Sequence, residues 1–78
     1  MAKYIVVHWD WEDGHGWRAQ SEIDSTDTPL TADELRDGYD GYYKAGDEIR
    51  LYEVVDEDLA ITQLRATYIV PSDYKAAD

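Results

Sequence analysis

The chain has 78 residues, of which 18 are acidic and 7 are basic, so its formal net charge is −11 at pH 7. This charge excludes ordinary binding to a nucleic-acid backbone, which requires clustered Lys and Arg, and it disfavours anionic membranes. The absence of Cys excludes disulfides and thiolate metal sites, and no stretch approaches the about 20 apolar residues of a membrane helix. We therefore expect one cytoplasmic domain over residues 1–78, with a frayed tail at residues 72–78.

The first predicted strand runs from Tyr4 to Trp11, where β-branched and aromatic residues alternate between two faces. Residues 12–16 contain two glycines and predict a turn. Residues 17–23 then return as a second strand, so the pattern predicts an N-terminal hairpin. The uncharged face of the first strand holds Ile5, Val7, Trp9 and Trp11.

A short helix is predicted after the loop at residues 24–30. Thr31 and Glu34 have the spacing of a capping box, in which the Thr31 hydroxyl accepts the Glu34 amide and the Glu34 carboxylate accepts the Thr31 amide. The helix is expected to end near Gly38, and an irregular continuation to Lys44 stays open.

The C-terminal half predicts two further strands, residues 47–55 and 59–70, joined by a tight acidic turn at residues 56–58. The fourth strand is apolar on both sides, which predicts a central position and pairing with the first strand. Pro71 ends it, because proline has no amide donor. The expected fold is α+β: a four-stranded antiparallel sheet from two hairpins with one short helix, in the order ββαββ, with a half-open small barrel as a variant.

Enzymatic chemistry is not expected, because no serine stands in a nucleophile elbow and a domain of this size offers little room for a catalytic cleft. A metal-binding alternative rests on closely spaced ligand types near the first turn, but their spacing matches no standard zinc motif. Solvated faces and turns are the preferred interpretation, so neither a metal nor a cofactor is expected. The residues of this alternative are His8, Asp10, Glu12, Asp13 and His15.

The negative charge is concentrated in residues 31–58, which carry ten acids and three bases. Carboxylates at alternate strand positions lie about 6.6 Å apart, close to the spacing of successive phosphates in a nucleic-acid strand. A rigid array of acids can therefore occupy a cationic groove, with aromatic side chains as anchors. Trp9 is assigned to the core, and residues 10–13 form a second acidic cluster. The predicted partner-binding residues are Asp33, Asp37, Asp40, Asp47, Glu48, Glu53, Asp56, Glu57, Asp58, Tyr39, Tyr42, Tyr43, Trp11 and Trp17.

In length, net charge, two-hairpin pattern and the acid runs at residues 10–13 and 56–58, the whole chain resembles small acidic inhibitors from phages and mobile elements. These include anti-CRISPR and anti-restriction proteins that mimic DNA. The resemblance implies a stoichiometric inhibitor that acts without cofactors in the host cytoplasm. Its partner would be a basic surface of a nucleic-acid-handling complex, rather than nucleic acid or a membrane.

Two alternative functions stay open. The first is a small phage structural or assembly protein that oligomerises through a sheet edge, for example as a homodimer. The second is a housekeeping domain from a high-salt cytoplasm, because such proteins are acidic and poor in lysine and this chain has three lysines.

Overall fold

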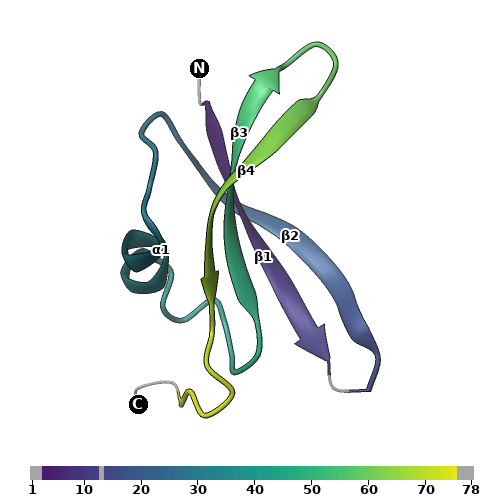
Figure 1. The fold of residues 1–78 in the computed structure, drawn as a ribbon, viewed down its shortest axis with the longest axis vertical. Helices are drawn as coiled ribbons and strands as arrows, with labels where there is room; N and C mark the ends of the chain where they lie inside the picture. The colour runs from purple at the N-terminus through teal and green to yellow at the C-terminus, as the bar shows by residue number, and fades with distance from the viewer. Residues whose placement is uncertain (1–2, 13, 76–78) are drawn as a thin grey trace.

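The computed structural model describes residues 3–12 and 14–75. Its elements are β1 (Tyr4–Glu12), β2 (Gly16–Thr26), α1 (Ala32–Gly38), β3 (Glu48–Asp56) and β4 (Ile61–Ile69). The strands form one antiparallel sheet in the spatial order β2-β1-β3-β4 (Figure 1). The prediction of an α+β fold with order ββαββ is confirmed. Within the described residues no pairing joins β2 to β4, so the half-open barrel stays a prediction.

β4 lies at an edge of the sheet, so the prediction that the fourth strand is central and pairs with the first is wrong. β3 takes the place beside β1, because Ile49 and Leu51 of β3 are fully buried. The short turn of the second hairpin then leaves β4 with β3 as its neighbour. The apolar residues on both sides of β4 therefore do not mean that the strand is buried. The side chains of Leu64 and Ile69 are 51% and 65% exposed.

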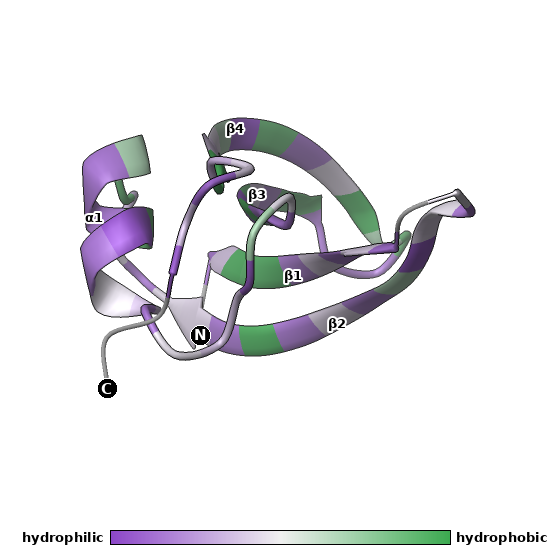
Figure 2. Ribbon diagram, turned by 90° about the horizontal axis from the view of Figure 1, so that it is seen from below, coloured by the Kyte–Doolittle hydropathy of each residue, from purple (hydrophilic) through white to green (hydrophobic). Residues whose placement is uncertain are grey.

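The core lies between α1 and one face of the sheet. Figure 2 shows α1 standing against one side of a strongly curved sheet. The helix packs against β4 and β3, on the sheet face to which β1 contributes Val6, whereas Trp9 lies half-buried on the opposite face. The aromatic face of β1 is therefore not the one that meets the helix. The fully buried apolar side chains are Val6, Leu35, Ile49, Leu51 and Val70.

The helix begins and ends through local interactions that the sequence predicted. The Thr31 hydroxyl accepts the Glu34 amide at 3.2 Å, and the Glu34 carboxylate accepts the Thr31 amide at 3.0 Å, so the capping box is confirmed. The helix ends at Gly38, and the continuation to Lys44 is wrong. Residues 39–47 instead form a loop, in which Gly46 has a left-handed φ of 87°.

Candidate functional site

The surface around α1 brings acidic side chains from three segments together. Asp33 and Asp37 lie on the helix, and their side chains are 82% and 69% exposed. Glu34 and Asp40 are also exposed, and Asp24 at the end of β2 faces the end of the helix. We call these five residues the α1 acidic face. Because the fold holds them close together around one helix, their charges add at short range.

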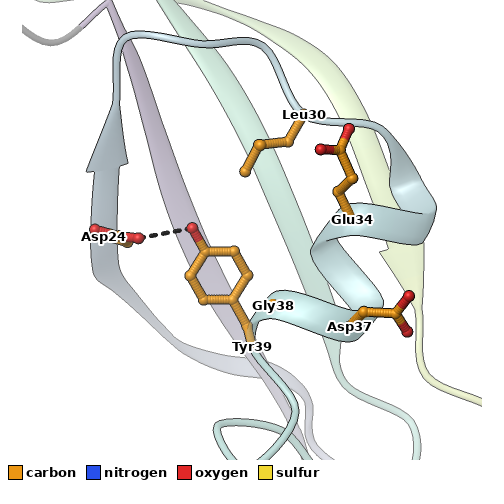
Figure 3. A pocket seen from close by; sticks show the side chains of 6 residues that line it. All are labelled: Asp24, Leu30, Glu34, Asp37, Gly38 and Tyr39. Atoms are coloured by element: carbon orange, nitrogen blue, oxygen red, sulfur yellow. Dashed lines mark hydrogen bonds between the residues drawn. The ribbon is translucent and has the colours of Figure 1, made fainter.

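A hollow of about 460 Å³ lies between the end of β2 and α1 (Figure 3). The Tyr39 ring crosses it, and the Tyr39 hydroxyl donates a hydrogen bond to Asp24 at 2.7 Å. Burial and this hydrogen bond raise the pKa of Tyr39 to about 12. The same bond, together with the Ser25 amide, holds the pKa of Asp24 below its usual range. The hollow thus combines apolar walls with carboxylates, and its lining residues are Asp24, Leu30, Glu34, Asp37, Gly38 and Tyr39.

A second, smaller hollow of about 280 Å³ lies on the other side of the helix end. Asp37 lines both hollows, so it lies between them. Tyr74, from the segment after β4, donates a short hydrogen bond to Asp40 at the second hollow. This contact raises the pKa of Tyr74. The lining residues are Arg36, Asp37, Asp40, Tyr43, Tyr68 and Tyr74.

Arg36 is the basic side chain within this face. Its guanidinium contacts Asp37 at 2.8 Å and Asp33 at 3.5 Å. The hydrogen bond and the charge of Arg36 hold the pKa of Asp37 below its usual range. All three side chains are largely exposed, so solvent screens these ion pairs and they contribute little to stability. One base against five acids leaves the α1 acidic face strongly negative.

Asp47, predicted to bind a partner, is instead withdrawn from solvent, with its side chain 1% exposed. Its carboxylate accepts hydrogen bonds from His8 Nε2 at 2.7 Å, the Trp11 amide at 3.0 Å and the Lys44 amide at 2.9 Å. Burial raises the pKa of this carboxyl, but the hydrogen bonds outweigh burial and hold the pKa below its usual range. Asp47 therefore fastens the loop before β3 to the first strand.

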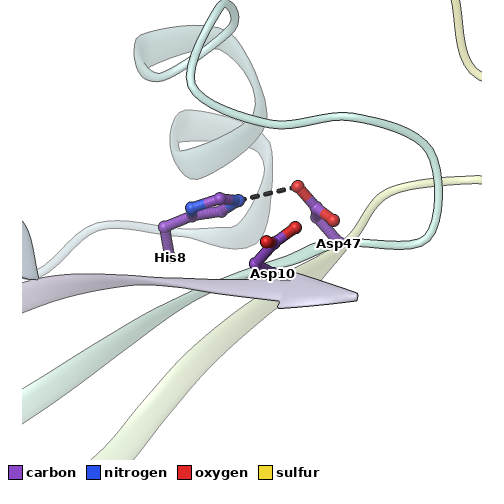
Figure 4. A group of neighbouring side chains, drawn as sticks. All are labelled: His8, Asp10 and Asp47. Atoms are coloured by element: carbon purple, nitrogen blue, oxygen red, sulfur yellow. Dashed lines mark hydrogen bonds and ion pairs between the residues drawn. The ribbon is translucent and has the colours of Figure 1, made fainter. Parts of the chain in front are cut away.

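His8, Asp10 and Asp47 direct potential metal ligands at one point, with the ligand atoms within 4.8 Å of one another (Figure 4). The Lys44 ammonium contacts both carboxylates, Asp47 at 3.2 Å and Asp10 through a short ion pair. A metal ion would have to displace this ammonium, so the cluster already contains its own cation. This geometry favours a structural role for the three side chains.

The remaining residues of the metal-binding alternative do not join this point. Glu12 pairs with Arg18 at 2.6 Å on the outside of the first hairpin. His15 is exposed in the turn, and Asp13 lies outside the described residues. The second acidic cluster of the sequence is therefore largely neutralised where the structure describes it.

The predicted acids of β3 do not form an array of evenly spaced charges. Glu48 and Glu53 lie on opposite faces of the strand, because side chains alternate between faces and Glu53 is an odd number of residues after Glu48. Glu48 pairs with Arg50 at 2.9 Å, and Glu53 pairs with Arg65 at 2.8 Å. The last three predicted acids lie at the β3–β4 turn: Asp56, Glu57 and Asp58.

Of the predicted tyrosine anchors, one is exposed, one is half-buried and one is buried. Tyr42 is 59% exposed beside Tyr39, with their ring centroids 6.4 Å apart. Tyr43 is buried, and its hydroxyl donates to the Arg36 carbonyl at 2.8 Å. Tyr42 and Tyr39 therefore remain available near the α1 acidic face, whereas Tyr43 stabilises the fold.

The tryptophans lie at the other end of the sheet, in and around the first hairpin. Trp17 is 38% exposed and packs edge-to-face on Trp9 and Trp11, with centroids 5.9 and 5.2 Å apart. The Arg50 guanidinium lies 4.2 Å from the centroid of Trp9. Trp11 and Trp17 belong to this stack and line neither hollow, so the two predicted tryptophan anchors do not lie on the α1 acidic face.

Sequence reasoning missed two residues of this face, Asp24 and Glu34, and two further residues that line the hollows, Leu30 and Tyr74. Asp24 and Tyr74 lie on segments far from α1 in the sequence, so no local pattern links them to the helix. The sequence predicts Glu34 as a residue that stabilises the start of the helix, not as a partner-binding residue. The excess of acids in residues 31–58 was the signal that located the helix part of the face.

No protein-family model matches the chain, and no curated protein or solved structure is significantly similar to it. The resemblance to acidic phage inhibitors rests on length, charge and acid runs, and it stays a prediction. Among the described residues, no helix has the length and apolar content needed to cross a membrane.

Proposed function

We propose that this protein is an acidic, non-catalytic binding protein that inhibits a nucleic-acid-handling complex. It would occupy a basic surface of that complex in place of nucleic acid, in the cytoplasm and without a cofactor. The observation that supports this proposal is the α1 acidic face, where Asp37 lies between two hollows lined by further carboxylates and tyrosines.

The larger hollow fits a lysine or arginine side chain. Leu30 and the Tyr39 ring offer apolar contact for its aliphatic stem, while Asp24 and Asp37 can accept hydrogen bonds from its charged end. An incoming guanidinium would compete with Arg36 for Asp37. Because that pair is exposed and screened by solvent, the exchange costs little.

Electrostatic attraction would govern the encounter. A net charge of −11 steers a cationic partner toward the protein and raises the association rate, and dissolved salt screens this attraction. The sequence predicted acids evenly spaced along a strand, whereas in the structure the exposed acids are grouped around α1. The mimicry would therefore lie in local charge density and hollows rather than in a regular phosphate-like spacing.

The experiment is a tagged pulldown from the lysate of a bacterium with CRISPR and restriction systems, at low and high salt, read by mass spectrometry. We expect a nucleic-acid-handling complex that is lost at high salt and displaced by added DNA. Recovery of the bait alone at low salt, or of a complex that DNA does not displace, would contradict the proposal.

Two matched double variants then locate the surface. Asp33→Asn with Asp37→Asn removes two charges from the α1 acidic face, and Glu57→Gln with Asp58→Asn removes two from the β3–β4 turn. Figure 1 shows this turn at the far end of the second hairpin from α1. The helix pair should weaken the captured complex at least about tenfold, equal to about 1.4 kcal/mol, and the turn pair should weaken it less. Equal losses would mean that total charge, rather than this face, drives binding.

A further inference from the structure

The smaller hollow is walled in part by aromatic rings that three separate segments contribute. Tyr43 belongs to the loop after α1, Tyr68 to β4 and Tyr74 to the segment after β4. The Tyr43 ring packs against both others, with centroids 5.6 Å from Tyr68 and 5.1 Å from Tyr74 and planes tilted by 59° and 56°. Tyr43 is buried, whereas Tyr68 and Tyr74 are half-buried. Tyr68 and Tyr74 therefore present aromatic surface to an open space of about 280 Å³.

The hydrogen-bonding groups of this hollow are already engaged with one another. Arg36 donates to both carboxylate oxygens of Asp37, at 2.8 and 3.2 Å. The Tyr74 hydroxyl donates a short hydrogen bond to Asp40, and the Tyr43 hydroxyl donates to the Arg36 carbonyl at 2.8 Å. A ligand with N–H groups would therefore compete with these donors for the same acceptors. A cation without N–H groups leaves all of them in place.

Charge and size narrow the class of ligand further. Two carboxylates and one guanidinium line the hollow, and the whole chain has a net charge of −11, so the local field attracts cations. The faces of tyrosine rings also attract cations through the ring quadrupole. The volume of about 280 Å³ lies just below the about 300–1,000 Å³ of pockets that enclose a drug-sized ligand. The hollow therefore suits a small cationic head group.

We propose that the smaller hollow binds a quaternary ammonium group, such as the trimethylammonium group of choline. Its methyl groups contact the rings of Tyr68 and Tyr74, and Asp37 and Asp40 supply the attracting charge without giving up their hydrogen bonds. The two hollows share Asp37 but differ in their other lining residues, so this site is separate from the one proposed for a lysine or arginine side chain. The inference goes beyond the proposed function and does not rest on it. A free cation is favoured over the head group of a choline lipid, because the acids around α1 repel a phosphate.

An NMR titration of the full chain with choline, at constant ionic strength, tests the proposal. We expect saturable shifts of the Tyr68 and Tyr74 ring signals. Ethanolamine, which has hydrogens in place of the methyl groups on nitrogen, should bind at this site at least about tenfold more weakly. Phosphocholine and the uncharged analogue of choline, with carbon in place of nitrogen, should also bind more weakly.

Each probe can overturn the proposal. No saturable shift with choline would exclude the site, and equal binding of ethanolamine would show that charge alone is recognised. Equal binding of the uncharged analogue would show a merely apolar hollow. Phosphocholine that binds at least as tightly as choline would exclude a free cation as the preferred ligand.

A matched pair of variants at Tyr74 isolates the contribution of the ring. Tyr74→Phe and Tyr74→Leu both remove the hydroxyl that binds Asp40, but only the phenylalanine keeps an aromatic face. Tyr74→Leu should therefore bind choline about threefold or more weakly than Tyr74→Phe. Tyr42→Leu is the control, because Tyr42 is exposed and lines neither hollow, and its choline affinity should change by no more than about twofold. Circular dichroism verifies that each variant is folded. Equal affinities of the two Tyr74 variants, or an equal loss with Tyr42→Leu, would refute the aromatic site.

Discussion

Asp47 and His8 are 39 positions apart in the chain, and their side chains meet at 2.7 Å beside the core. The Asp47 carboxylate also accepts the Trp11 and Lys44 amides, so one side chain joins β1 to the loop that precedes β3. Removing a buried acceptor that receives several hydrogen bonds lowers the free energy of unfolding, because each donor is then left unpaired where water cannot replace the acceptor.

Asp47→Asn should lower the free energy of unfolding by about 2–3 kcal/mol. The amide keeps one acceptor oxygen but places an NH₂ group against donors that need an acceptor. Urea denaturation measures the change. Asp58→Asn is the matched control, because Asp58 is exposed in the β3–β4 turn and its change should stay within about 0.5 kcal/mol. A near-neutral Asp47→Asn would show that the network contributes little.

Protonation of the Asp47 carboxylate should contribute to the loss of stability at low pH. Its pKa is lowered in the folded state, so its contribution is fully present above the unfolded value of about 3.9. That contribution is lost as the pH falls through the lower, folded pKa. As the pH falls below about 3.9, stability should therefore decline less steeply for Asp47→Asn than for the wild type, as unfolding measured from about pH 5 downward would show. Parallel curves would exclude Asp47 as a source of the acid sensitivity.

Two features require glycine at position 46: the close approach of the Trp11 ring and a backbone conformation with positive φ. A Cβ atom there would lie 2.8 Å from Trp11 Cδ1, and φ is 87°. Gly41 also has a positive φ, of 108°, but a Cβ there meets no atom within 4 Å. Gly41→Ala should cost about 1 kcal/mol through backbone strain, and Gly46→Ala about 2 kcal/mol more through overpacking. Equal losses in urea denaturation would show that Trp11 moves aside freely.

Arg50 is expected to stabilise the helix-free face through the ring of Trp9, 4.2 Å away. A double-mutant cycle with Arg50→Lys and Trp9→Leu should give a coupling of about 0.5–1 kcal/mol, because lysine lacks the flat guanidinium that stacks on the ring. Arg65→Lys is the control, since Arg65 is half exposed and pairs with Glu53 at the sheet edge. A coupling near zero would mean that the contact is packing without cation–π attraction.

Thr31 is expected to hold the start of α1 through the capping box. Thr31→Ala should destabilise the protein by about 1 kcal/mol, and Thr31→Ser should restore most of it, because serine keeps the accepting hydroxyl. Denaturation of the three proteins, with amide exchange at residues 33–35 as a local readout, checks the prediction. Destabilisation by Thr31→Ser equal to that by Thr31→Ala would contradict the role of the hydroxyl.

Much of the fold could be predicted because its signals are local. Thr31 and Glu34 cap one another across a single helical turn, and the alternation in Tyr4–Trp11 follows from the two-residue repeat of a strand. The candidate site was predicted in part. Asp33, Asp37 and Asp40 lie where the acidic middle of the sequence predicted an exposed negative surface, on and just after one short helix.

The sequence by itself determined the hairpins, the cap and the excess of negative charge, because each depends on composition or on residues a few positions apart. Only the tertiary structure decided that Asp47 is buried, that Asp24 faces α1 and that β4 lies at an edge. These properties depend on which distant segments dock together. The residues next to an acid in the sequence do not reveal whether its side chain will face another segment or water. Only the packing of distant segments decides whether a carboxylate is buried and structural or exposed.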